Sequence, residues 1–434
     1  MGDRASVGQA RGMDTRASLP VLARRVALAT AVLALLATPF ASAAEAGITQ
    51  PFKPKTSVTL APGIDFEVGT MKTTGGRPQS VRVGTVSPRL DGVQLKALLS
   101  NDKVVKREVV TRIVKAKARP GFKPMLATNG DMSMRNRVDA YAAPHSMAVS
   151  GGELMVAQAC IRPTLGIDAD GTARISDVRT HISVIPPGKT MPKQIHRVNT
   201  HRDDGLVVLF TRRFASSTQT AYGGVEVIVE MEGKLRPNDR QRVRVVKVRK
   251  NGGNTPLRWG QAVISVKNPT QKWVYRLKVG QRFDLTTQVV KKVNKPCGGS
   301  IAAAPNWSDI TEAQGGNYFT LRNGKVAAPS RSTYPSGSRR HPRSGLGITA
   351  DGRVLMITVD GRRAASVGVT LAEMGQLMKS QGARHAFNLD GGGSAVMDRH
   401  KAGSGRFEVA NKPSDGKQRP ATQAFAAFRV TPAD

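Results

Sequence analysis

Short β-rich runs separated by turn-forming residues dominate this chain from about Thr56 onward. Such runs are typical of strands, because β-branched side chains pack well on a pleated surface. Few long helical patterns interrupt them. Strands are predicted at Leu206–Phe210, Val225–Glu230, Val243–Val248 and Val354–Val359. The sequence therefore predicts an α+β fold, built on a β-rich mixed sheet with few helices.

Hairpin turns are predicted where Asp or Asn precedes Gly, because the favoured two-residue turn needs positive φ at both central positions. Two of these turns belong to similar segments, Gly166–Gly171 and Gly347–Gly352, so both are interpreted as hairpins. For Asp360 and its neighbour Arg362, an exposed turn is favoured over a catalytic role. The predicted turns are Asp170-Gly171, Asn323-Gly324, Asp351-Gly352 and Asp360-Gly361.

One helix is predicted with defined ends. Thr370 can cap it, Glu373 stands three residues later as in a capping box, and Gly382 follows an apolar stripe. A strand-like run, Ala386–Asp390, comes next and leads into three glycines and a short helix from Ser394. The segment is therefore helix, strand and glycine loop in order.

The amino end predicts export. Arg24 and Arg25 precede an apolar core, Val26–Ala37, and Ala41-Ser42-Ala43 supplies a small-residue cleavage pattern. The core is short for a membrane span, and no later segment is apolar enough to act as a membrane anchor. We expect residues 1–43 to be a signal peptide and the mature protein to be secreted or in the cell envelope. The two cysteines, Cys160 and Cys297, could pair or remain buried thiols.

The formal charge of +35 and a pI near 11.1 predict that the surface attracts anions. Specific nucleic-acid binding is not favoured, because only 5% of residues are aromatic and no zinc spacing or basic recognition helix is present. Serine-elbow and zinc-protease signatures are also absent from the sequence. Neither a cofactor nor a metal site is predicted.

The heptad Asn388–Ser394, with glycine at 391, 392 and 393, is the most informative motif. Consecutive glycines lose backbone entropy on folding, so they suit places where φ is positive or a ligand approaches main-chain amides. A nucleotide P-loop is excluded, because no Gly-Lys-Ser/Thr follows. A tight structural turn is the alternative interpretation.

Three further motifs add polar residues at predicted strand ends. Asn129-Gly130-Asp131 follows the apolar Met125–Ala127, and Arg343 precedes a strand. The third is the loop from Asn411 to Arg419. Asp beside Gly commonly forms a turn with its own backbone, so a structural role remains open for Asp131 and Asp390.

Together these motifs resemble, in chain order, those of the phosphodiester glycosidase family. The resemblance runs from about Thr56 to the carboxyl end and is weakest between residues 175 and 295. Two departures bear on substrate choice: Met132 and Ser133 stand where aromatic residues are commoner, and Gly345 follows Ser344 where Thr and Ala are commoner.

The resemblance implies hydrolysis of the bond between a sugar's anomeric carbon and a phosphodiester. One carboxylate would either attack the anomeric carbon or deprotonate the attacking water. Asp390 is the first candidate for this role and Asp131 is the second. Arg343, and next Arg419, would hold the phosphate. Substrate-binding groups are predicted at Asn129, Gly130, Asn388, Gly391, Gly392, Gly393, Ser394, Asn411 and Arg419.

The predicted organisation is a catalytic domain in two parts, residues 44–174 and 296–434, separated by an inserted or variable β-rich region, 175–295. The expected partner is a sugar-phosphate or anionic polysaccharide of cell-wall or exopolysaccharide type. The other hypothesis is a non-catalytic protein that binds polyanions or the cell wall. Turnover of a sugar phosphodiester by the mature protein separates the two.

Protein made with its own leader in a bacterial secretion host is expected to begin near Ala44, because the charged, apolar and small-residue regions occur in the order that a signal peptidase requires. Mass spectrometry of the recovered protein measures its first residue. Recovery of a product that retains the leader would contradict the assignment.

Overall fold

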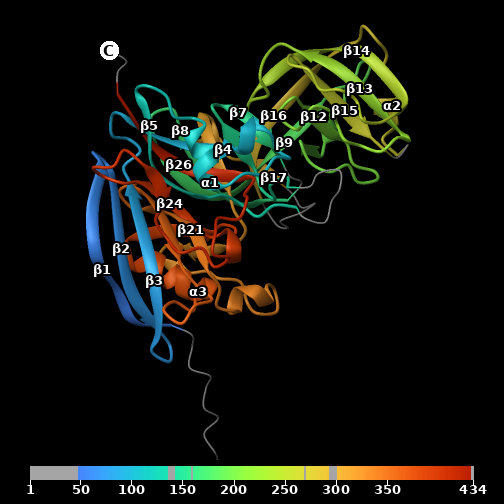
Figure 1. The fold of residues 1–434 in the computed structure, drawn as a ribbon. Coiled ribbons are helices and arrows are strands. Elements are labelled where there is room, and N and C mark those ends of the chain that lie inside the picture. The colour runs from blue at the N-terminus through green and yellow to red at the C-terminus, as the bar shows by residue number, and fades with distance from the viewer. Residues whose placement is uncertain (1–46, 135–141, 158–159, 268–269, 293–300, 432–434) are drawn as a thin grey trace, which may run out of the picture. The chain divides into compact units, whose positions relative to one another are not determined.

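Three sheets, antiparallel in almost every pairing, make up the part of the protein that the computed structural model describes (Figure 1). That part comprises residues 47–134, 142–157, 160–267, 270–292 and 301–431, all within the unit Glu45–Asp434. The predicted signal peptide and Cys297 lie outside the described residues, whereas Cys160 is disulfide-bonded. No helix of the described chain is long and apolar enough to cross a membrane.

The eight-stranded sheet joins the beginning of the unit to its carboxyl-terminal part. Three neighbouring strands on one side of the sheet come from residues 48–86. The third of them, β3, pairs with β22 along six residues. In spatial order the strands are β1 (Ile48–Ala61), β2 (Ile64–Thr73), β3 (Arg77–Val86), β22 (Val354–Val359), β21 (Arg343–Thr349), β23 (Ala383–Asn388), β19 (Phe319–Arg322) and β20 (Lys325–Val326). Helix α3 (Leu371–Ser380) buries Met374, Leu377 and Met378 against this sheet.

A five-stranded sheet packs on the eight-stranded one, because Phe66 and Leu346 share a buried cluster with Leu126 and Phe425. Its order is β25 (Phe407–Val409), β24 (Met397–His400), β5 (Phe122–Asn129), β26 (Gln423–Val430) and β4 (Val93–Leu99). Helix α1 (Val110–Lys115) contributes three buried residues to a cluster with these strands.

Residues 148–315 form the third sheet, whose own core includes Val227, Ile264 and Leu285. Its main order is β11 (Arg197–Val198), β12 (Val208–Thr211), β15 (Gln261–Val266), β13 (Gly224–Met231), β14 (Arg240–Gly252), β16 (Arg282–Lys292), β9 (Ala173–Val184), β8 (Arg162–Asp168), β18 (Ile310–Gly315), β6 (Ala148–Ser150) and β7 (Glu153–Val156). Two short strands, β10 (Lys193–Ile195) and β17 (Ile301–Ala303), pair with β9 and β16. Helix α2 (Lys272–Tyr275) follows β15.

The mostly β architecture confirms the predicted fold class. Helix α3 has the predicted capping box, and Gly382 follows it with a φ of 84°. The hairpin turns at Asp170-Gly171, Asn323-Gly324 and Asp351-Gly352 are also confirmed, since each joins two paired strands. Four short 3-10 helices complete the described elements: Ser100–Asp102, Pro305–Trp307, Pro335–Ser338 and Gly392–Ser394.

Two local predictions were wrong. Asp360-Gly361 is not a hairpin turn: the chain leaves β22 into a loop that reaches α3, and the tight turn lies between Arg363 and Ser366. Asp360 is 2% exposed rather than on the surface. The second difference is smaller, because a 3-10 turn ending at Ser394 replaces the helix expected to begin there.

Candidate active site

Several strand ends meet at a pocket of about 570 Å³. Arg343 begins β21 and Asn388 ends the neighbouring antiparallel strand β23. Both residues therefore lie at the same end of these two strands. The pocket is lined by Met132, Ser133, Met134, His145, His201, Tyr334, Ser336, His341, Arg343, Arg362, Asn388, Leu389, Asp390, Gly391, Gly392 and Arg419. Residues predicted from three separate motifs therefore line one cavity.

Asn129 and Gly130 hold the backbone of Asp390 in place. The Asn129 side chain donates from Nδ2 to the Asp390 carbonyl at 2.8 Å, and the Asp390 amide donates to the Gly130 carbonyl at 3.1 Å. Asn129 is fully buried, and its Oδ1 accepts from the Val396 amide. Its amide therefore connects the end of β5 to both sides of the glycine loop and does not line the pocket.

Asp390 is the carboxylate that lines the pocket, and its Oδ1 accepts the Gly391 amide at 3.0 Å. Asp131 lies behind the wall, next to Met132, and is 6% exposed. Its Oδ1 accepts from the Met132 amide at 2.7 Å, and its Oδ2 is buried without a hydrogen-bond partner in the described chain.

Burial raises the pKa of Asp131 to about 7, and the negative charge of Asp390 raises it further, whereas Arg162 opposes both effects. This carboxyl group is thus half-protonated near neutral pH. The electrostatic coupling also shows that the two predicted carboxylates lie near each other. Asp131 can therefore influence the ionisation of Asp390 without contacting a ligand in the pocket.

Arg343 is 3% exposed and is held by backbone carbonyls. Its Nε donates to Val369, and its Nη2 donates to Ser336 and Arg339 at 2.8 and 3.1 Å. Burial lowers its pKa to about 10, so the guanidinium remains charged at neutral pH. These bonds use both Nη2 hydrogens, and the guanidinium also has a side-chain hydrogen bond with Tyr334, so a two-point contact with phosphate is restricted.

Arg362 and Arg419 approach the glycine loop closely. A Cβ at Gly392 would lie 3.0 Å from the Arg362 Nη2, and one at Gly393 would lie 2.1 Å from the Arg419 Nη2. The Arg419 guanidinium is paired with Asp415 at 2.6 Å. The Gly391 and Gly392 amides donate within the protein, to Asp390 and Pro342. The main effect of Gly392 and Gly393 is therefore to leave space for the arginine side chains next to the loop.

The sequence pattern predicts an exposed turn for Arg362 rather than a role in the site, whereas the structure gives it a φ of 62° and a place in the lining of the pocket. A positive φ is uncommon in residues other than glycine, and the residues that adopt it are often found at functional sites. Its guanidinium makes no hydrogen bond or ion pair with other described side chains or carbonyls. His145, His201 and His341 also line the pocket, although only His341 adjoins a sequence motif.

The remaining predicted binding residues have varied positions. Asn388 lines the pocket and is 2% exposed, with its Oδ1 buried and without a described partner. Ser394 is buried at the end of the 3-10 turn outside the lining. Asn411 is 8% exposed, and its side chain bonds Asp360, Ala395 and Met397. Its position favours a role in shaping the site over ligand contact.

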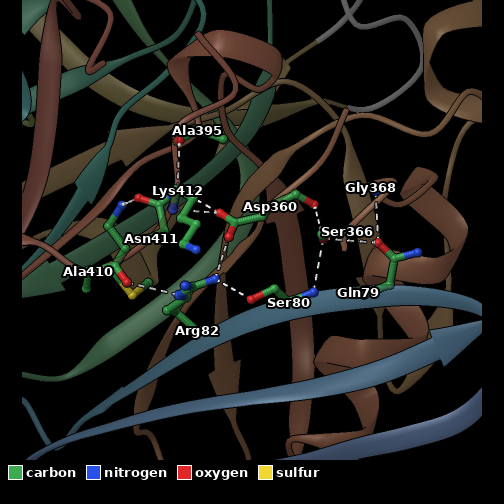
Figure 2. A network of polar contacts seen from close by, with 11 residues as sticks. Gln79, Ser80, Arg82, Asp360, Ser366, Gly368, Ala395, Ala410, Asn411 and Lys412 are labelled. Atoms are coloured by element: carbon green, nitrogen blue, oxygen red, sulfur yellow. Dashed lines mark hydrogen bonds and ion pairs between the residues drawn. The ribbon is translucent and has the colours of Figure 1, made fainter. Parts of the chain in front are cut away.

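A buried ion pair connects the segments that carry these residues (Figure 2). Asp360, at the end of β22, accepts from the Arg82 Nη1 on β3 at 2.6 Å, and their side chains are 2% and 7% exposed. Its other carboxylate oxygen accepts from the Asn411 side chain at 3.0 Å and the Lys412 amide at 3.1 Å. The nearby Gln79 accepts from the Gly368 amide at 2.8 Å. The network therefore fixes both loops from which Arg362 and Arg419 extend.

The fold and the pocket together define a mostly β protein with a carboxylate and several cations in one cavity. Residues 242–428 match the model of the phosphodiester glycosidase family. The match confirms the resemblance and supports a glycosidase-type hydrolase. It contains Arg343, Arg362, Asp390 and Arg419, and it begins inside the region predicted as variable.

Individual relatives are distant or partial. A SPbeta prophage-derived uncharacterized protein of Bacillus subtilis, YomE, is 36% identical over 101 residues, which are 23% of this chain and 15% of that protein. A hypothetical protein from Synechocystis superposes with a TM-score of 0.68 at 16% identity, covering 88% of this chain and 64% of that one. A candidate exported protein of Burkholderia pseudomallei gives 0.59 at 19% identity, covering 81% and 74%. Both structures show a shared fold.

Replacement Asp131→Asn is expected to change the pH dependence of stability. The raised pKa means that the native state favours the protonated carboxyl group of Asp131. The stability that this group contributes is therefore fully present below about pH 4 and is lost as the pH rises through about 7. The variant, which mimics the protonated form, should gain stability relative to wild type over that interval, by at most roughly 4 kcal/mol. Urea unfolding at pH 4 to 8 measures the difference. A pH-independent difference would contradict the assignment.

Replacement Asp360→Asn is expected to lower the free energy of unfolding by about 3 kcal/mol, because it leaves Arg82 buried without its counter-ion. Chemical denaturation measures the loss. Asp284→Asn is the matched control: Asp284 pairs with the exposed Arg240, so its removal should cost about 1 kcal/mol or less. Equal losses in the two variants would show that the buried network has no special weight.

Proposed function

We propose that this protein is an exported hydrolase that cleaves the bond between a sugar's anomeric carbon and a phosphodiester, in polymers of cell-wall or exopolysaccharide type. The observation that carries the proposal is the presence of one carboxylate, Asp390, in the same pocket as Arg343, Arg362 and Arg419. A phosphate needs cations, and an anomeric carbon needs a carboxylate. The predicted signal peptide and the structural likeness to a candidate exported protein support export.

In this mechanism Asp390 removes a proton from the attacking water, or it attacks the anomeric carbon and water then hydrolyses the glycosyl ester so formed. Cleavage of the bond between the anomeric carbon and oxygen releases a phosphate monoester, which departs with little protonation and whose charge is stabilised by the three arginines. Arg362 is the main binding group, because its guanidinium has no other partner within the described structure. Arg343 and Arg419 contribute positive charge, Arg419 next to its Asp415 partner.

Asp131 acts through Asp390 in this proposal. When Asp131 is protonated, it carries no negative charge to oppose that of Asp390, so Asp390 alone serves as nucleophile or base.

The lining of the pocket contains both neutral and cationic residues. Met132, Met134 and His145 are neutral at pH 7, because burial lowers the pKa of His145 to about 4, whereas the arginines are cationic. We therefore place the sugar against the methionine and histidine residues and the phosphate against the arginines.

Replacement Asp390→Asn is expected to reduce turnover of a synthetic sugar-1-phosphate diester at least about a hundredfold, because the amide can neither attack nor accept a proton. Release of reducing sugar measures turnover, and thermal melting confirms folding. Asp351→Asn is the matched control, since Asp351 also precedes a glycine but lies exposed in a hairpin turn.

Near-normal turnover by a folded Asp390→Asn protein would remove Asp390 from the mechanism. If the wild type binds the diester and polyanionic polymers without cleaving them, the non-catalytic binding hypothesis is correct instead.

A further inference from the structure

A second groove of about 540 Å³ lies between the loop that joins β9 to β10 and the segment around α2. It shares no lining residue with the candidate active site. Both rims are held in place. Pro186 and Pro187 stiffen one rim, and the other is anchored by Trp273 and Leu277, which are buried in the core of the third sheet.

Four cations line this groove and lack counter-ions. Lys189, Lys193, Lys272 and Arg276 are all exposed, and none forms an ion pair within the described residues. No Asp or Glu belongs to the lining. Elsewhere on the same sheet some exposed cations are paired, such as Arg240 with Asp284 and Arg244 with Glu230, whereas others, such as Lys247 and Arg282, form no ion pair within the described residues. The groove differs from these positions because four unpaired cations share one lining that contains no carboxylate. Four clustered, unpaired charges repel one another, and a bound anion relieves that repulsion.

The lining also indicates the kind of anion. Trp273 is 8% exposed, so the groove presents no aromatic face on which a nucleic-acid base could stack. Three of the four cations are lysines, which are rotatable point charges and suit phosphates spaced along a flexible chain.

We propose that this groove binds a phosphodiester-linked polysaccharide at phosphates remote from the bond that is cleaved. The inference rests on the proposed function and specifies its substrate as a polymer rather than a small diester. Simultaneous contact at two places on one chain raises the apparent affinity without changing the chemistry in the pocket.

The test compares wild type with Lys193→Gln/Lys272→Gln/Arg276→Gln. The ligands are a defined polyglycosyl phosphate of several repeats and a synthetic diester of a single repeat, with affinity measured by calorimetry. We expect the Kd for the polymer to rise on the order of tenfold, while kcat and KM for the single repeat stay unchanged. Lys53→Gln/Lys55→Gln/Lys72→Gln is the control, because it removes the same charge from exposed positions on β1 and β2.

A rise in Kd of equal size in the control would overturn the proposal, because it would reduce the effect to overall charge. Tighter binding of single-stranded DNA than of the polysaccharide, with the same dependence on the groove, would overturn it in favour of a nucleic-acid site. Polymer binding is measured separately from turnover. Groove-dependent binding by a wild type that cleaves nothing would therefore contradict the proposed function alone.

Discussion

The buried ion pair between Arg82 and Asp360 is the constraint on which the candidate active site depends. Arg82 lies on β3, near the beginning of the described chain, and Asp360 ends β22 almost 280 residues later. The same carboxylate receives the Asn411 side chain and the Lys412 amide. Since a buried charge without its partner is costly, these segments must assemble together. The ion pair thus helps to position residues that it does not contact.

The second requirement of the site is that several arginine side chains approach the glycine loop closely. Three arginines repel one another, and two of them are held in place or compensated by other groups. Arg343 is held by backbone carbonyls, and Arg419 is compensated by Asp415, whereas Arg362 has a positive φ and no described partner. Gly392 and Gly393 leave the space that the latter two side chains occupy. The glycine motif is thereby explained by the size of its neighbours more than by its own amides.

Local sequence signals predicted the local elements well. The capping box at Thr370 and Glu373 and the Asn323-Gly324 turn depend on contacts within a few residues, so their chemistry is visible in the sequence. Asp360 failed for the opposite reason. Asp360 followed by Gly361 is a pair typical of a turn. The ion-pair partner of Asp360, Arg82, is distant in sequence, so no local pattern indicates the pairing.

The same distinction applies to the pocket. Asp390, Arg343 and Arg419 belong to motifs with unusual glycine or arginine spacing, and all three line the cavity. Asn129 and Asn411 were also found through motifs, but spacing cannot tell whether an amide faces a ligand or a backbone carbonyl. His145 and His201 had no signal, because tertiary packing of the segment after β5 against the third sheet brings them to the pocket.

The departures at Met132 and Ser133 gain a physical meaning from this arrangement. Both residues line the pocket, and Met134 follows them there. Flexible thioethers adapt to irregular shapes and offer no flat face for stacking on a sugar ring. His145 is neutral at physiological pH and lies beside them, so this region supplies contact and hydrogen bonding without charge. The arginines and the methionine residues thus present different chemistry to the same cavity.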